Sequence, residues 1–382
     1  MRPGIEVLLS DSMQLVRGRR VGLVTNQTGI DRSGRRDVDR MLAAGIRVTM
    51  LFGPEHGLYG RIDVDTRVDQ AHFIDSTTGL PAYVLHTGAA PIAPTPEMLA
   101  DVDVLVIDLQ DVGARYYTYP VTAALVMEAA ARAHLPVVML DRPNPIGGLV
   151  QGNSTDSLGR SAVARFPVAM RHGMTIGEVA RMTRALLGLD VDLHVVPVAG
   201  WRRSMTYENT GLPWVPPSLN LSTTESLFHY PGLCLFEGTN LSVGRGTDAP
   251  FRQVGAPWLD TTQVLATLRA ARLPGVRFSG VEFTPIRPGD GKLAGQRVPG
   301  IRLTLTDAAI YDPTVTAAHL LAALQAHHAG MFAFQPAQFD RLAGGSELRE
   351  AILRGERAES ITAGWGPSRA RFLARRAPYL IY

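Results

Sequence analysis

The segment Phe52–Gly57 holds an acid between a proline and a histidine, with glycines on both sides. Such a turn fixes the direction of the Glu55 carboxyl, and a carboxyl with apolar neighbours can serve as a general acid near neutral pH, as in glycosidases. An ordinary surface turn would show the same pattern. His56 is a candidate acid, orienting partner or metal ligand, but no histidine follows at i+3 or i+4. We expect Glu55 to be catalytic, His56 to bind substrate, and no metal to be bound.

Residues 108–119 form the densest polar group in the chain. Asp108 and Asp111 are three residues apart, and Arg115 follows four residues after the second. Neighbouring carboxylates can push their pKa values apart, and the three tyrosines of this segment suit a sugar ring or another polyhydroxylated ligand. A helix start with an Asp111–Arg115 ion pair would use the same spacing. We expect both aspartates to be catalytic, stabilising charge, orienting the substrate or activating water. The expected substrate contacts here are Arg115, Tyr116 and Tyr119.

The stretch Tyr230–Phe251 combines glycines with an acid, an amide and an arginine and has no helical period. A backbone-rich loop of this kind can form the wall of a binding site, although glycine-rich loops also occur simply as hairpins. Its length and polarity favour the wall. The residues that we expect to contact substrate are Glu237, Asn240 and Arg245.

The first half of the chain alternates short apolar runs with amphipathic segments, a pattern typical of βαβ units. The expected strands are Arg20–Thr25, Val48–Phe52, Val102–Ile107 and Val137–Leu140. The expected helices are Asp37–Ala44, Thr122–His134 and Thr175–Leu187, the last with Thr175 as its cap and Glu178 three residues on. Near-continuous apolar strands with helical crossovers predict an α/β fold, a Rossmann-like doubly wound parallel sheet covered on both faces.

Polar residues follow each of these four strands, and ligands of open parallel sheets bind beyond the carboxyl ends of the strands. Asn26 follows the first strand, Glu55 the second, Asp108 the third, and Arg142 and Asn144 the fourth. Such residues are also common in ordinary turns. Because all four groups fall at strand ends, we expect them to open onto one rim, with Asn26, Arg142 and Asn144 contacting substrate.

Residues 199–222 are rich in proline and tryptophan with little periodicity and predict a long loop or crossing between domains. We therefore expect a Rossmann-like catalytic domain over 1–222 and a smaller α+β domain over 223–382 that completes the substrate cleft. The remaining expected strands are Asp192–Val198, Arg277–Pro285 and Gly300–Thr306, and the remaining helices are Thr261–Ala271 and Thr314–His328.

The composition of the 382-residue chain excludes several classes of protein. The net charge of +3 is spread along the chain without a block of like charges, so nucleic-acid binding is not expected. Lys292 is the only lysine among 38 basic residues, a bias that we attribute to codon usage.

No apolar run approaches the ~20 residues of a membrane helix. The N-terminus shows no signal-peptide core, so a cytoplasmic location is expected. Cys234 is the only cysteine, which excludes an intramolecular disulfide and a cysteine-based metal site.

Dinucleotide and nucleotide phosphate motifs are missing, because the chain has neither GxGxxG after the first strand nor GxxxxGK[ST]. A GxSxG nucleophile elbow is missing as well, which argues against an α/β-hydrolase.

Motifs along nearly the whole chain resemble those of the NamZ family, formerly classed as DUF1343. They are VGLVTNQTG (21–29), LFGPEHG (51–57), TGLP (78–81), PTPEML (94–99), DLQDVGARYYTY (108–119), DRPNP (141–145), PPSLN (216–220), YPGLCLFEGTNLSVGRGTDAPF (230–251), GAPW (255–258) and YLIY (379–382). The resemblance implies a Rossmann-like domain followed by a smaller domain. It also implies an exo-β-N-acetylmuramidase that needs no cofactor and releases terminal non-reducing N-acetylmuramic acid (MurNAc) from peptidoglycan fragments.

The expected substrates are peptidoglycan-derived muropeptides or MurNAc–GlcNAc saccharides, with neither nucleic acid nor membrane as a partner. The acid of the family's GPEHG motif falls on Glu55. Members of the family are often exported, whereas this chain shows no export signal. MurNAc carries a lactyl carboxylate, which a planar guanidinium binds well. Arg115, Arg142 and Arg245 are the candidates. The alternative to an enzyme is a non-catalytic muropeptide-binding or glycan-binding protein on the same fold.

Overall fold

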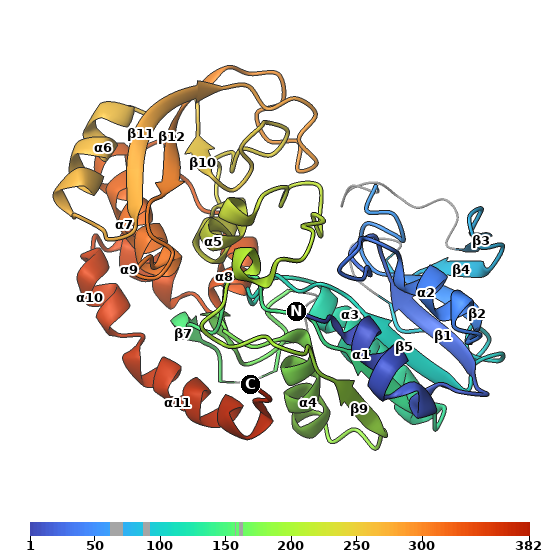
Figure 1. Cartoon of the computed structure of the whole chain (residues 1–382). Coiled ribbons are helices and arrows are strands. Elements are labelled where there is room, and N and C mark those ends of the chain that lie inside the picture. The colour runs from blue at the N-terminus through green and yellow to red at the C-terminus, as the bar shows by residue number, and fades with distance from the viewer. Residues whose placement is uncertain (62–71, 87–91, 157, 160–162) are drawn as a thin grey trace.

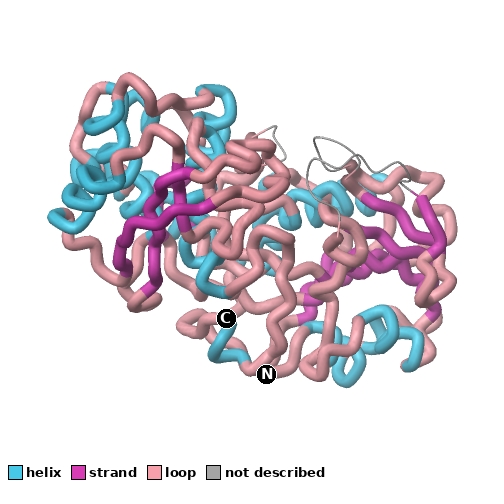
Figure 2. Tube along the Cα trace, turned by 90° about the horizontal axis from the view of Figure 1, so that it is seen from above, coloured by secondary structure: helices cyan, strands magenta, loops and turns pink. Residues whose placement is uncertain are grey.

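The computed structural model describes residues 1–61, 72–86, 92–156, 158–159 and 163–382. A mostly parallel sheet forms one lobe and a small antiparallel sheet forms the other, with helices and long loops between them (Figure 1). The two termini lie close together between the lobes in both views (Figures 1 and 2). Among the described residues, no helix combines the length and the apolar character needed to span a bilayer.

The large sheet has the strand order β3-β4-β2-β1-β5-β6-β9. Its strands are β1 (Arg20–Thr25), β2 (Arg47–Gly53), β3 (His72–Ile74), β4 (Pro81–Val84), β5 (Val104–Asp108), β6 (Val137–Leu140) and β9 (Leu193–Val196). Neighbouring strands run parallel except for β3 and β4. The chain builds outward from β1 through β2 and then returns to the other side of β1 as β5. The order therefore reverses between β1 and β5, which is where sheets of this class bind ligands. The predicted Rossmann-like fold is confirmed.

Helices cover both faces of this sheet because successive side chains of a strand point to opposite faces. Val104 and Val106 pack in a cluster with α1 (Gly4–Asp11) and α2 (Asp37–Ala43). Leu105 and Ile107 pack in a cluster with α3 (Tyr119–Arg132) and α4 (Ile176–Leu186). The predicted cap is confirmed, since Thr175 and Glu178 form a reciprocal capping box at the start of α4.

The smaller sheet is antiparallel in the order β10-β12-β11. Its strands are β10 (Gln253–Gly255), β11 (Val276–Phe283) and β12 (Val298–Leu305), and a separate hairpin pairs β7 (Gln151–Ser154) with β8 (Ala169–Arg171). The helices of this half are α5 (Thr224–Leu233), α6 (Thr261–Ala270), α7 (Pro313–His328), α8 (Pro336–Ala343), α9 (Glu347–Leu353), α10 (Ala358–Ala363) and α11 (Gly366–Arg376). Short 3-10 helices are η1 (Met13–Leu15), η2 (Tyr207–Thr210), η3 (Cys234–Gly238) and η4 (Ala377–Tyr379).

The stretch expected to be a non-helical loop is partly helical, so this expectation was wrong for residues 230–238. They form the end of α5 and all of η3. The physical reason is burial: every residue from Ser226 to Leu233 is buried, and this packing stabilises a helix despite the internal Pro231. The remainder of the stretch, from Thr239 to Phe251, is the irregular loop that the sequence predicts.

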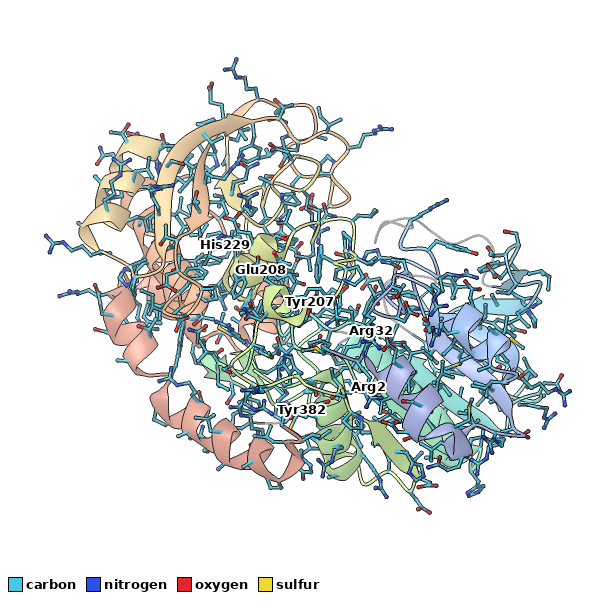
Figure 3. The ribbon with its side chains drawn as sticks, viewed as in Figure 1. Arg2, Arg32, Tyr207, Glu208, His229 and Tyr382 are labelled. Carbon is cyan, nitrogen blue, oxygen red and sulfur yellow. The ribbon has the colours of Figure 1, made fainter. Side chains whose placement is uncertain are left out.

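The C-terminal end of the chain returns to the large sheet. Phe372 of α11 packs with Val121 and Ala124 of α3. The Tyr382 hydroxyl accepts a hydrogen bond from the Val198 amide at 2.7 Å and donates one to Asp141 at 2.8 Å, and Tyr382 lies below the loops that join the lobes (Figure 3). A continuous apolar cluster also spans both lobes, so the cleft between them has packed walls.

Candidate active site

A polar cavity of about 470 Å³ lies where the two lobes meet, within the usual volume range for small-molecule sites. The first lobe contributes Glu55, His56, Tyr116, Tyr117, Thr118, Val163, Ser218 and Leu221, and the second contributes Tyr230, Glu237, Arg245, Phe251, Asp290, Lys292, Gln335 and Gln338. A larger cavity of about 740 Å³ lies against α8 to α11, but it contains none of the expected site residues. The smaller cavity is therefore the candidate active site.

Glu55 occupies a tight turn directly after β2. The Gly57 amide donates to the Pro54 carbonyl at 2.9 Å, and both His56 and Gly57 have positive φ angles of 72° and 71°. The Thr118 hydroxyl donates to Oε2 of Glu55 at 2.5 Å, which fixes the orientation of the carboxyl. Glu55 is half-buried and lines the cavity, so its other oxygen can approach a bound ligand.

A buried network below this turn holds it in place. The Asn26 amide nitrogen donates to the Tyr119 hydroxyl at 2.8 Å, and that hydroxyl donates to the Pro217 carbonyl at 2.7 Å. The Glu55 carbonyl lies 3.4 Å from the same hydroxyl. Asn26 and Tyr119 are not among the residues that line the cavity. The structure therefore makes them supports of the Glu55 turn.

The opposite wall carries two acids, Glu237 and Asp290, and two cations. Arg245 binds Oε1 of Glu237 through Nε at 2.7 Å and through Nη2 at 2.6 Å. Burial opposes the charge of Arg245, but attraction to Glu237 raises its pKa. Lys292 Nζ donates to the backbone carbonyls of Glu237 and Thr239, both at 2.7 Å. Burial lowers the pKa of Lys292, although Asp290 and Glu237 act in the opposite direction.

Three tyrosines and Phe251 form the aromatic part of the lining. Tyr116 and Tyr117 pack edge-on against Tyr230, with ring centroids 6.2 and 6.4 Å apart. The Tyr117 hydroxyl is buried and has no hydrogen-bond partner within the described residues. Burial raises its pKa well above the ordinary value, so it is a neutral donor at physiological pH. A cavity with three acids, two cations and aromatic walls suits a polar ring, and the cations suit a negative group on it.

Comparison with known proteins identifies the group to which this architecture belongs. The family model described as the N-terminal part of the exo-beta-N-acetylmuramidase NamZ matches residues 21–225, and the model of its C-terminal part matches 228–382. The chain belongs to the NamZ family. It is 39% identical over 385 residues to the peptidoglycan beta-N-acetylmuramidase NamZ of Bacillus subtilis strain 168, covering 100% of this chain and 91% of that protein.

Solved structures from the NamZ family share the fold. Two DUF1343 family proteins from Bacteroides fragilis NCTC 9343 each cover 100% of this chain and 98% of their own. One has 33% sequence identity and a TM-score of 0.89, and the other has 30% identity and a TM-score of 0.79. The likeness in fold therefore extends over both lobes.

Asp108 and Asp111, expected to be catalytic, do not line the cavity of this NamZ-family chain. Asp108 is fully buried and pairs with Nε and Nη2 of Arg142, the latter at 2.9 Å. Asp37 lies beside this pair and bonds the Thr25 hydroxyl. Burial and the negative charge of Asp108 raise the pKa of Asp37 well above its ordinary value. Asp108 and Arg142 thus form an ion pair beneath the site.

Asp111 is also buried and takes part in a separate contact. Its Oδ2 accepts from the Gly113 amide at 3.1 Å and lies 3.3 Å from Nε2 of His172. Because Nδ1 of His172 accepts from the Met174 amide at 3.2 Å, Nε2 carries the proton. The Asp111–Arg115 ion pair of the alternative interpretation does not form. Asp111 instead holds the loop after β5.

Three further expected contacts lie outside the cavity lining. Arg115 is buried and donates to the Leu342 carbonyl of α8 at 2.8 Å and to Asn153 of β7. These two hydrogen bonds join β7 to α8. Asn144 bonds the Met174 carbonyl at 2.8 Å. Asn240 bonds the Met331 carbonyl at 2.8 Å. Of the expected site residues, those that the cavity brings together are Glu55, His56, Tyr116, Glu237 and Arg245.

The sequence reasoning missed several residues that line the cavity. Thr118 stands within the tyrosine-rich motif and could have been found from it. Lys292 had a usable signal, because it is the only lysine of the chain. Gln335 precedes α8 and Gln338 lies in its first turn, and no motif in the sequence around them indicates a binding site. Among the described residues, no group of three or more His, Cys, Asp or Glu side chains is arranged to hold a metal ion.

Proposed function

We propose that this protein is an exo-β-N-acetylmuramidase that releases terminal non-reducing MurNAc from peptidoglycan fragments. The observation that carries the proposal is the Glu55 carboxyl, oriented by Thr118 and lining a polar cavity between the lobes. The 39% identity to a peptidoglycan beta-N-acetylmuramidase over the whole chain supports the same assignment. Muropeptides and MurNAc–GlcNAc saccharides are the substrates that this function requires.

Hydrolysis of a glycoside needs a proton for the leaving oxygen and a group that stabilises the oxocarbenium-like centre. Glu55 supplies the proton in our proposal, because the Thr118 hydroxyl occupies one carboxyl oxygen and leaves the other for the leaving group. The breaking bond gives its electron pair to the glycosidic oxygen, which takes the proton from Glu55. Water then adds to the anomeric carbon and passes its proton to the Glu55 carboxylate, which restores the acid form of Glu55.

Glu237, an acid on the opposite wall of the cavity, takes the stabilising role in this mechanism. Arg245 binds its carboxyl group, and a negative charge beside the anomeric carbon lowers the energy of a positively charged transition state. The substrate's own acetamido oxygen is the competing candidate for the same role. The anomeric configuration of the product distinguishes one displacement from two, and NMR of the reaction mixture measures it directly.

Asp108, Asp111, Asn26 and Asn144 act as supports in this proposal, because each is buried and bonded within the protein. We also propose a domain division at residue 222, with 1–222 carrying Glu55 and 223–382 completing the cleft. The family models, which meet between residues 225 and 228, support this division. No step of the mechanism calls for a metal or an organic cofactor.

Incubation with a MurNAc–GlcNAc disaccharide tests the proposal. The expected result is free MurNAc and GlcNAc in equal amounts, detected by chromatography and mass spectrometry. Binding of the disaccharide without release of either sugar would contradict catalysis and favour a glycan-binding protein. Release of sugar from the reducing end of longer chains would contradict the exo-acting assignment.

A further inference from the structure

Lys292 stands out among the charged residues of the cavity by its partners. Its ammonium group donates to two neutral backbone carbonyls, those of Glu237 and Thr239. Within the described residues, no carboxylate oxygen lies within 4.0 Å of it as an ion-pair partner. Arg245, the other cation of the lining, is already bound by Glu237. An ammonium has three N–H donors, so Lys292 keeps one for a ligand.

The loop that carries Lys292 is built against the Arg245 loop. The Ile286 amide donates to the Gly246 carbonyl at 2.9 Å, and Gly246 has a φ angle of 72°. A Cβ at Gly246 would lie 2.5 Å from the Ile286 carbonyl oxygen, so only glycine allows this close approach. The Lys292 amide also donates to Asp290 at 3.1 Å. These contacts fix the backbone of the loop that carries Lys292 against the Arg245 loop.

Asp290 and Glu237 offset part of the cost of burying this cation, but burial remains the larger effect. Because no carboxylate contacts the ammonium directly, a negatively charged ligand group can offset the rest. The substrate of the proposed reaction carries one such group near its ring, the lactyl carboxylate. Arg115 and Arg142, two of the three arginines considered for this group, are buried in other contacts away from the cavity lining. The third, Arg245, is paired with Glu237.

We propose that Lys292 is the specificity-determining cation that binds the lactyl carboxylate of MurNAc. This inference rests on the proposed function. It gives the only lysine of the chain a role that arginine does not fill: a compact ammonium can use two donors on carbonyls and direct the third to a carboxylate. A purely structural role, in which Lys292 closes the end of η3, would leave sugar selectivity unchanged.

Lys292→Met tests the inference by removing the charge at nearly constant length. The assay measures kcat/KM on a nitrophenyl MurNAc glycoside and on the same glycoside with the lactyl group as an uncharged amide. In the wild type we expect the acid to be preferred by about tenfold or more, the factor of one charge-assisted hydrogen bond. The variant should lose that preference, and Lys292→Arg should recover part of it. Arg287→Met, an exposed cation of the same loop outside the cavity lining, is the matched control and should keep the wild-type ratio.

A second measurement needs no variant. Labelling with [ε-13C]lysine gives one side-chain signal, because the chain has a single lysine. Free MurNAc should raise the pH midpoint of that signal, since an adjacent carboxylate favours the charged ammonium, whereas GlcNAc should not. Equal midpoints with both sugars, or an unchanged acid-to-amide ratio in an active Lys292→Met, would overturn the inference alone. Selective binding of MurNAc without hydrolysis would instead overturn the proposed function and leave the inference standing.

Discussion

Asp108→Asn tests whether Asp108 has a structural or a catalytic role. The sequence predicts a catalytic residue here, whereas the structure shows a buried ion pair with Arg142. Asp108 and Arg142 have side chains that are 1% and 3% exposed, and the guanidinium binds both carboxyl oxygens. Removing one partner of a buried ion pair costs about 3–5 kcal/mol, because the other charge is left unpaired. Burial, the larger cause, and the charge of Asp108 both raise the pKa of the neighbouring Asp37, so losing that charge eases the ionisation of Asp37 beside the unpaired Arg142. We therefore expect a loss near the lower end, about 3 kcal/mol.

Urea denaturation followed by tryptophan fluorescence measures this loss. Asp103→Asn is the matched control, because Asp103 also makes a two-pronged contact with an arginine, Arg20, but its side chain is 40% exposed. The control should lose less than about 1 kcal/mol, since exposed ion pairs contribute little. Suppose instead that Asp108→Asn unfolds within about 1 kcal/mol of the wild type but loses hydrolysis by a factor of 100 or more. That result would refute the structural assignment and return Asp108 to the catalytic groups.

Two other substitutions follow from buried contacts. Tyr119→Phe should destabilise the fold by about 1–3 kcal/mol, because it leaves Asn26 and the Pro217 carbonyl without their hydrogen-bond partner. It should also lower kcat, because this network supports the Glu55 turn. Unchanged stability in urea titrations would contradict this. Burial raises the pKa of Asp141 to about 6, so the folded state binds more protons than the unfolded state between about pH 4 and 6. The free energy of unfolding should therefore fall as pH rises through that window, by about 3 kcal/mol for a pKa shift of some two units. Asp141→Asn should flatten this pH dependence. Parallel curves of stability against pH for both proteins would exclude Asp141 as the cause.

The sequence predicts the large sheet well because its strands are buried on both faces. β1 and β6 match the expected residues at both ends, since each is an apolar run bounded by polar or proline residues. The edge strand β3 and its neighbour β4 were missed because they have three and four residues and show no continuous apolar run. The helical ending of α5 was missed because Pro231 and Gly232 interrupt its pattern, and tertiary packing overrides their low helix propensity.

The candidate site could be predicted in part. Glu55 follows from a turn motif, which places it at the end of β2, but the Thr118 hydroxyl that orients its carboxyl lies far away in the sequence. The strand-end rule correctly places Asp108 at the carboxyl edge of the sheet. It does not predict whether the side chain there is exposed to the cavity or buried. Whether an acid meets solvent or a buried arginine depends on residues distant in sequence, as with Arg142. Lys292 lies far from every motif in the first lobe, and only the packing of its loop against Arg245 brings it to the cavity.

The role of Glu55 as general acid is the central claim, and the effect of Glu55→Gln on two substrates tests it most directly. Glutamine keeps the shape of the side chain and its contact with Thr118 but has no proton to give. On a MurNAc–GlcNAc disaccharide, whose leaving group needs protonation, kcat should fall by about 10²–10⁴. On a nitrophenyl MurNAc glycoside, whose leaving group departs without a proton, the loss should be far smaller. Equal losses on both substrates would contradict acid catalysis by Glu55.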